Sequence, residues 1–286
     1  MKISTEIYSS ARHVGEERAI ELLAKAGFDA WDFSMFEMAR FDYGKCVFEE
    51  STHPLAGKDY IKFAKNLRKI GEDNGIHCNQ SHAPFPSAPI NKDLLKRAIE
   101  CTAIAGGEIC IIHPNNNANA RENAELYNML LPFAKEHGVK IATENMWNWE
   151  NGATQSCFAA CSTLESFKEH IDIINDPYFV ACLDLGHAEM VGSGDGAPYM
   201  IRGLGDRLQA LHIHDNDRLH DSHQIPFSMN MDFNEIAKAL KDISYQGYLT
   251  LEADSYINKF NKDNVLEGIK NLAESARRLE KLIENA

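Results

Sequence analysis

Apolar runs and amphipathic stretches alternate along this chain with a regular spacing. Eight short, β-branched apolar runs predict strands at about 2–8, 30–35, 76–81, 108–113, 140–145, 180–185, 208–214 and 247–253. Between them, apolar residues recur three and four positions apart, as in helices, most clearly from Val265 to Ile283. Eight strand–helix units without a second composition regime predict an α/β fold: a single (β/α)8 TIM barrel in one domain, residues 1–286.

A doubly wound parallel sheet is the alternative that this alternation allows. That fold normally carries a glycine-rich turn after its first strand, and the segment EIYSSARHVGEE is not such a turn. Three connections are longer than a bare barrel needs, at about 36–56, 146–161 and 215–231. All three follow predicted strand ends, so we expect them to fold over one rim of the barrel.

Local signals add three expectations. Ser162 with Glu165 three residues later predicts a capping box that opens the helix LESFKEHIDII. His170 lies in that helix, where we expect it at the solvated surface. The seven cysteines are scattered and contain no CxxC pair, which predicts reduced, mostly buried thiols in a cytoplasmic protein.

The net charge and the hydropathy of the chain limit the kinds of partner that this protein is expected to bind. The formal net charge of −13 counts against a polyanionic partner, because nucleic-acid binding usually needs a basic face. No apolar run approaches the roughly 20 residues that cross a bilayer, so no membrane partner is expected. The first ten residues, MKISTEIYSS, read as a strand and not as a secretory signal. Acidic barrels of this kind often pair into homo-oligomers, although nothing in the sequence marks an interface.

Four acid and imidazole side chains stand at the ends of the last four predicted strands. They are Glu144, Asp184, His212 and Glu252. Because a β/α barrel brings its strand ends to one rim, these side chains should meet there. Three carboxylates and one imidazole would repel one another unless a divalent cation held them. The sequence therefore predicts an enzyme with one divalent metal ion; the oxygen-rich set favours Mn²⁺, with Mg²⁺, Co²⁺ or Zn²⁺ as alternatives.

Further polar residues stand at other predicted strand ends. His82 and His113 follow the third and fourth strands, and His187 lies three residues after Asp184. The loop after the seventh strand adds His214, Asp215, Arg218, His220, Asp221 and His223. Each alone has an ordinary interpretation, such as a histidine bonded to a backbone carbonyl or an aspartate that caps a helix. Their number at one predicted rim favours a functional site.

The strings E-N, D-x-G-H, H-x-H-D and L-E, in this order, resemble the xylose isomerase-like superfamily of metal-dependent barrels. That superfamily contains sugar and sugar-phosphate isomerases and epimerases, inosose dehydratases, and abasic-site nucleases of the endonuclease IV type. The resemblance follows the strand order through nearly the whole chain, and it is densest from residue 140 to 255.

The resemblance points to two branches. Ketohexose 3-epimerases bind one metal ion through Glu, Asp, His and Glu, which match Glu144, Asp184, His212 and Glu252. Three of their substrate-site residues match His187, Glu150 and Arg218. The nuclease branch binds three zinc ions through nine ligands, which resemble His82, His113, Glu144, Asp184, His187, His212, Asp221, His223 and Glu252. Asp221 and His223 are therefore additional candidate metal ligands, while His82 and His113 also occur in sugar-handling members.

Other features favour a small sugar or polyol as the substrate. The loop after the second strand is acidic and aromatic, and the loop after the fifth strand offers Trp147 and Trp149. Indole faces suit the apolar side of a sugar ring, although a lid packed on the barrel mouth is the plainer interpretation. A lyase or dehydratase of the same superfamily and an inactive sugar-binding barrel are the remaining alternatives.

The predicted activity is that of a sugar or sugar-phosphate isomerase or epimerase. A metal ion would stabilise the charge of an enediolate. Glu144 and Glu252 would take a proton from carbon and return it, in an order that depends on the substrate. His187 and Arg218 would hold substrate hydroxyls or a phosphate, and His82, His113, Glu150 and Trp147 would complete the substrate site. Whether the substrate is phosphorylated stays open.

Overall fold

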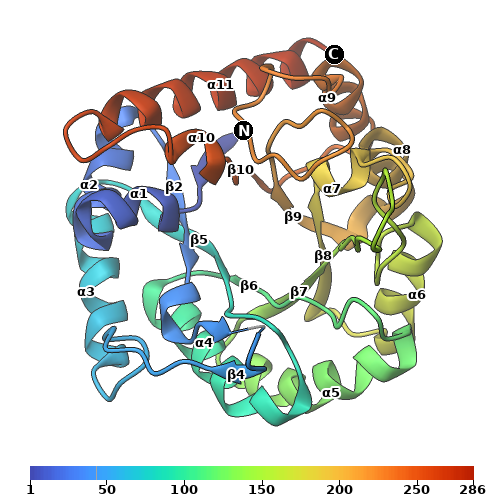
Figure 1. Cartoon of the computed structure of the whole chain (residues 1–286). Helices are drawn as coiled ribbons and strands as arrows, with labels where there is room; N and C mark the ends of the chain where they lie inside the picture. Colours follow the sequence, from blue (N-terminus) through green and yellow to red (C-terminus); the bar gives the residue numbers. More distant parts are fainter. Residues whose placement is uncertain (43) are drawn as a thin grey trace.

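Eight parallel strands form a ring that is surrounded by helices (Figure 1). The structure is a computed structural model that describes residues 1–42 and 44–286. The strands of the ring are β1 (Lys2–Thr5), β2 (Ala30–Ser34), β5 (His77–His82), β6 (Ile109–Ile111), β7 (Lys140–Glu144), β8 (Phe179–Asp184), β9 (Leu208–His212) and β10 (Tyr248–Leu251).

Backbone pairing closes the ring. Six strands pair in the order β2-β5-β6-β7-β8-β9, and β1 pairs with β10. The two remaining joints are single parallel bridges, Glu6 with Asp32 and Ile213 with Leu251. The predicted TIM barrel is thereby confirmed, and the doubly wound sheet, which stays open at its edges, is excluded.

The helices follow the strands in the predicted alternation, with short extra helices at several strand ends. They are α1 (Tyr8–Val14), α2 (Glu16–Ala26), α3 (Tyr60–Asp73), α4 (Lys92–Ala105), α5 (Ala120–Glu136), α6 (Leu164–Ile174), α7 (Leu185–Glu189), α8 (Ala197–Leu204), α9 (Phe233–Asp242), α10 (Asp254–Ile257) and α11 (Val265–Asn285). Short 3-10 turns lie at Phe36–Met38, Pro89–Asn91 and Gly205–Arg207. The long loop after β2 also contains the antiparallel pair of β3 (Phe41–Asp42) with β4 (Val47–Phe48). Within the described chain, no helix is long and apolar enough to cross a membrane.

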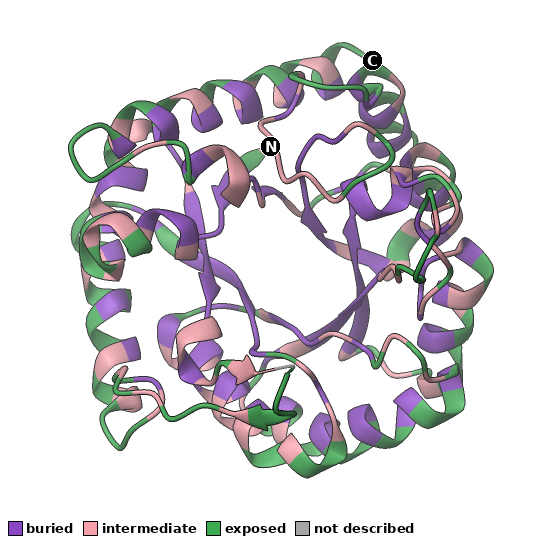
Figure 2. Cartoon of the chain, in the orientation of Figure 1, coloured by how far each residue is buried: buried purple, intermediate pink, exposed green. Residues whose placement is uncertain are grey.

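The barrel strands are buried on both faces, and each helix turns one buried stripe toward them (Figure 2). Side chains alternate between the faces of a strand. On β7, Ile141 packs in the core between strands and helices, whereas Ala142 belongs to a small cluster with Val180, Cys182 and Ala210. The same alternation turns the last residues of β7, β8 and β9 toward the inside of the barrel.

Two local expectations were wrong. The N-cap of α6 is Thr163, whose hydroxyl accepts a hydrogen bond from Ser166 N, while Ser162 bonds Ala159 N instead. His170 is buried, because its ring contacts Asn123 on the neighbouring α5 at 3.1 Å. The predicted burial of most thiols is confirmed, since five of the seven cysteines are buried.

Candidate metal centre

Four donor side chains meet inside the barrel at the carboxyl ends of its strands. Glu144, Asp184 and His212 are the last residues of β7, β8 and β9, and Glu252 follows β10 directly. One ligand atom from each lies within 4.8 Å of the ligand atoms of the other three. Because Asp184 pairs with His212 in the register of β8 and β9, the two side chains are held at one level. We call these four residues the central group.

His212 is the hub of the central group. Its Nδ1 lies 3.0 Å from Glu144 Oε1 and 3.4 Å from Glu252 Oε2. Its Nε2 lies 3.4 Å from Oδ2 of Asp32, a buried aspartate on β2. Both imidazole nitrogens therefore face carboxylates, so the ring lies where it can bind a cation or carry a proton.

Two carboxylate oxygens of the central group are buried without a hydrogen bond. They are Glu144 Oε2 and Asp184 Oδ2. Buried polar atoms nearly always have a partner, and leaving one unsatisfied costs about 1–3 kcal/mol. Oxygen atoms left over in this way, beside an imidazole, are suitable ligands for a divalent cation. The residues present therefore fit a metal site.

The pKa values reflect the same arrangement. Burial alone would lower the pKa of His212, yet the acidic groups around it, including Glu252 and Glu144, raise it well above its usual range. Burial would raise the pKa of Glu144 and Glu252, but the neighbouring histidines outweigh burial and lower both. A protonated imidazole thus balances the carboxylates, a role that a divalent cation takes over when it binds.

A second group of donors lies beside the first. It consists of His187, His214, Asp221 and His223, whose ligand atoms also lie within 4.8 Å of one another. Asp221 Oδ2 is 3.3 Å from His187 Nε2 and 3.1 Å from His223 Nε2. We call these four residues the outer group. His214 Nε2 is 3.1 Å from Asp184 Oδ1, so the outer group adjoins the central group. Burial opposes protonation of His187, but Asp184 and Asp221 raise its pKa to about 10.

A third group shares Glu144 with the central group. His82 and His113 contribute their imidazoles, with their Nε2 atoms 2.7 Å apart and His113 Nε2 3.2 Å from Glu144 Oε2. Burial and the proximity of His82 lower the pKa of His113, although Glu144 acts in the opposite direction. A lowered pKa favours the neutral form of His113, which is the form that binds a metal.

A cavity of about 920 Å³ opens above these groups. Its lining includes eight of the site residues predicted from the sequence: Glu144, Glu252, His82, His113, His187, Asp221, His223 and Trp147. Asp184 and His212 are fully buried. The described lining residues include no lysine and no arginine. Each long loop contributes to the lining, through Phe36, Trp147 and Asp221, among others.

Two predicted substrate residues lie outside this lining. Glu150 is exposed on the loop after β7. The Arg218 side chain is 53% exposed and lies 3.4 Å from Glu189 Oε2. Glu6 and Asp32 also lie at the site but were not predicted, although each is a polar residue at or near a strand end. His214 was considered a weaker candidate ligand, yet it belongs to the second group of donors.

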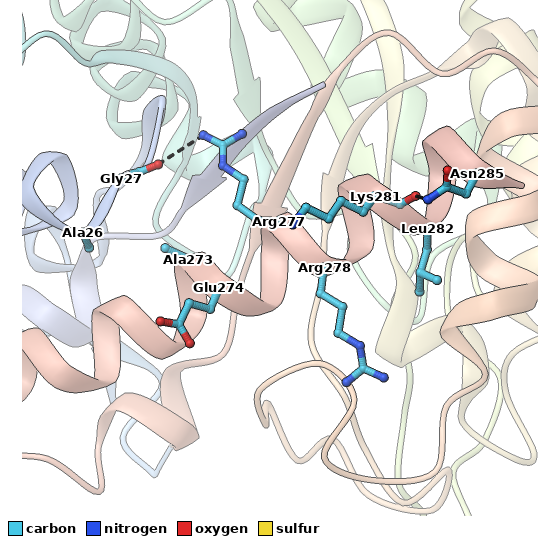
Figure 3. A pocket seen from close by; sticks show the side chains of 9 residues that line it. All are labelled: Ala26, Gly27, Ala273, Glu274, Arg277, Arg278, Lys281, Leu282 and Asn285. Carbon is cyan, nitrogen blue, oxygen red and sulfur yellow. Dashed lines mark hydrogen bonds between the residues drawn. The ribbon is translucent and has the colours of Figure 1, made fainter.

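A second cavity, of about 570 Å³, lies between α2 and α11 (Figure 3). Because barrel helices run antiparallel to the strands, the C-terminal parts of α2 and α11 lie at the end opposite the metal centre. One of its cations, Arg277, donates to the Gly27 carbonyl and pairs with Asp29 and Glu280. These contacts are structural, so the chemistry belongs to the first cavity.

Comparison with known proteins agrees with this geometry. The family described as "Xylose isomerase-like TIM barrel" matches residues 20–282. An uncharacterized protein of Methanocaldococcus jannaschii is 26% identical over 253 residues, which cover 82% of this chain and 78% of that protein. Fructoselysine 3-epimerase of Escherichia coli O157:H7 is 40% identical over 57 residues, 20% of this chain and 21% of the enzyme.

A solved structure shows the same fold. The crystal structure of a D-tagatose 3-epimerase-like protein superposes with a TM-score of 0.73 at 21% identity, covering all of both chains. At this identity the likeness concerns the barrel itself. The function has to be argued from the side chains of the site.

Proposed function

We propose that this chain, which belongs to the xylose isomerase-like TIM barrel family, is a divalent-metal-dependent sugar epimerase or isomerase. The observation that carries the proposal is the central group, in which three carboxylates and one imidazole converge within 4.8 Å at the floor of a cavity. The oxygen-rich donor set favours Mn²⁺, with Mg²⁺, Co²⁺ and Zn²⁺ as alternatives.

The residues divide into distinct roles. A cation held by Glu144, Asp184, His212 and Glu252 would supply Lewis-acid stabilisation of negative charge on a substrate oxygen. Glu144 and Glu252 line the cavity from β7 and the end of β10, so they reach a bound carbon from different sides. One carboxylate takes a proton from the carbon next to the carbonyl, and the other returns a proton to the opposite face.

The rest of the cavity positions the substrate. His187, His82 and His113 present ring nitrogens that can hold hydroxyl groups beside the two carboxylates. Trp147 offers an indole to the apolar face of a sugar ring. Glu150 and Arg218 lie outside the lining, so the proposal assigns them no substrate contact.

The outer group and the shared Glu144 favour a second candidate, a zinc phosphoesterase with three metal ions that acts on abasic DNA. Asp221, His223 and His187 would bind one additional ion, and His82 with His113 would share another with Glu144. The cavity argues against DNA, because no described lining residue is a lysine or arginine that could contact phosphates. We therefore rank this candidate second.

One experiment tests both candidates. Purified protein with added Mn²⁺ or Zn²⁺ is assayed on a panel of ketoses and on an abasic DNA duplex, and bound metal is counted by elemental mass spectrometry. We expect a product of unchanged mass from a ketose, and a loss of about 10²-fold or more in kcat for Glu144→Gln and Glu252→Gln. Glu125→Gln, on the exposed face of α5, is the matched control and should keep full activity.

The alternative outcomes are distinct. Incision of the abasic duplex together with about three equivalents of zinc would place the nuclease first. A product that has lost a leaving group would indicate a lyase. Full turnover by both glutamine variants would refute proton transfer by these carboxylates.

A further inference from the structure

We propose that the substrate is an unphosphorylated sugar that carries a bulky apolar or aromatic substituent. The sugar lies over the central group, and the substituent lies between two aromatic walls at the mouth of the cavity. This inference rests on the proposed function and names its substrate class. Three properties of the cavity carry it: its charge, its size and the distribution of its aromatic rings.

The described lining of the cavity lacks the side chains that most often bind a phosphate. Proteins bind phosphate with arginine, lysine or the N-terminus of a helix, and no lysine or arginine occurs among the described lining residues. The helices that start at this rim do not compensate. Glu6 lies two residues before α1, and Asp254 is the first residue of α10, so carboxyl groups line the cavity beside both helix starts. These carboxylates disfavour a dianionic phosphate in the part of the cavity that they line.

The cavity is too large for a free hexose alone. Its volume of about 920 Å³ lies near the upper end of the roughly 300–1,000 Å³ range of cavities that enclose drug-sized ligands. A free ketohexose is far smaller than such a ligand. With the sugar over the donors at the floor, most of the volume toward the mouth stays available for another part of the substrate.

One side of the mouth is a chain of aromatic rings. The rings of Tyr8 and Phe36 are 5.2 Å apart, and those of Phe36 and Phe85 are 5.4 Å apart. Phe85 then stacks on His113 at 5.1 Å, which links this wall to the floor of the cavity. Phe85 is nevertheless 37% exposed. Its exposed face is apolar surface at the mouth of a polar site.

A second set of aromatic rings in the lining belongs to the loop after β7. Trp147 lies 6.5 Å from the ring of His187, near the floor. Trp149 stacks on His220 at 6.0 Å and is 43% exposed. Large aromatic rings left exposed beside a cavity are typical of a surface that an apolar ligand covers. Metal binding and proton transfer do not use these outer rings, whereas an aromatic substituent would.

Matched substrates test the inference. D-fructose, D-fructose 6-phosphate, and the 1-O-benzyl and 6-O-benzyl ethers of D-fructose are incubated with the metal-loaded protein in D2O. Exchange of the carbon-bound protons next to the carbonyl, at C1 and C3, is followed by NMR. We expect one of the ethers to exceed D-fructose in kcat/KM by about tenfold, because burial of one aromatic ring contributes on the order of 1.5 kcal/mol. The phosphate should be the poorest of the four.

Variants and a binding measurement complete the test. The double change Phe85→Ala with Trp149→Ala should reduce the preference for the ether to about one, whereas Tyr199→Ala, on an exposed site of α8, should preserve it. Quenching of tryptophan fluorescence should detect the same preferred ether without turnover. Equal kcat/KM for D-fructose and both ethers, or a preference for the phosphate, would overturn the inference. Tight ether binding with no proton exchange on any sugar would instead refute the proposed function.

Discussion

Asp184 uses its two carboxylate oxygens for different purposes. Oδ1 accepts a hydrogen bond of 2.7 Å from His187 N and so caps α7, whereas Oδ2 is buried without a hydrogen bond. Asp184 is therefore a helix cap, and its free oxygen is compatible with the proposed role as a metal ligand. The cap fixes the carboxylate in one orientation, which is what a ligand on a strand end requires.

Glu6 is a buried carboxyl group that the metal centre does not use. Burial raises its pKa to about 7, although hydrogen bonds from Ser9 act in the opposite direction. Between about pH 4.5 and 7 the native state therefore retains a proton that the unfolded chain releases. The free energy of unfolding should fall as the pH rises through this window.

The change Glu6→Gln should remove this pH dependence. At pH 8 we expect the variant to be more stable than the wild type by up to about 3 kcal/mol, because an amide carries no cost of ionisation in a buried place. At pH 5 the difference should shrink below about 1 kcal/mol. Urea unfolding at both pH values measures it, with Glu125→Gln as the control. A difference that stays constant with pH would mean that ionisation of Glu6 is not the cause.

At the scale of elements, the turn from β8 into α7 is shaped by close packing against the loop after β9. A Cβ atom on Gly186 would lie 2.0 Å from the His214 ring, and the Gly186 carbonyl accepts a bond of 2.9 Å from Asn216. His214 in turn stacks on His223 at 4.0 Å. The glycine of the D-x-G-H string is therefore required by the space that the imidazole occupies.

The change Gly186→Ala should displace His214. We expect a loss of about 1–3 kcal/mol in the free energy of unfolding, because the added methyl group overpacks a fully buried site. Gly57→Ala is the matched control, since the nearest atom to its Cβ would be 3.9 Å away. Urea unfolding curves of the two variants give the comparison. Equal stabilities would show that the ring moves aside without cost.

At the scale of the whole molecule, a metal ion bound by the central group would tie together four consecutive strands. The candidate ligands come from β7, β8, β9 and the end of β10. The joint between β9 and β10 is otherwise a single bridge of Ile213 with Leu251. A bound cation would therefore strengthen the connection between β9 and β10, where the barrel has little backbone pairing.

Metal removal should lower the thermal stability of the whole barrel. At a free metal concentration of 100 times Kd, binding stabilises the native state by about 2.7 kcal/mol. This corresponds to roughly 4–5 °C in Tm for a chain of this size. Differential scanning calorimetry with Mn²⁺ and after chelation measures the shift. Asp184→Asn should show a much smaller response. Identical Tm values for the wild type in both conditions would contradict a metal site among these strands.

The barrel and the strand positions of its candidate ligands follow from the amino-acid sequence. Period-two and helical hydrophobic patterns are local, so they located all eight barrel strands and the last helix, Val265–Asn285. The order of strands then placed Glu144, Asp184, His212 and Glu252 at one rim. Strand boundaries were less accurate: the first was expected to reach residue 8, but β1 ends at Thr5, and α1 begins at Tyr8.

Which loop residues line the cavity depends on the path that each loop takes in the folded protein. Arg218 and His223 adopt positive φ values of 69° and 42°, a conformation that their side chains do not favour and that no local pattern announces. The loop path directs His223 and Asp221 into the cavity and leaves Arg218 on the surface beside Glu189. Likewise, Glu6 and Asp32 come close to the centre because β1 and β2 close the ring, a contact between residues far apart in sequence. Strand order and side-chain alternation follow from local physics, whereas these positions depend on how the loops and the last joints of the barrel pack.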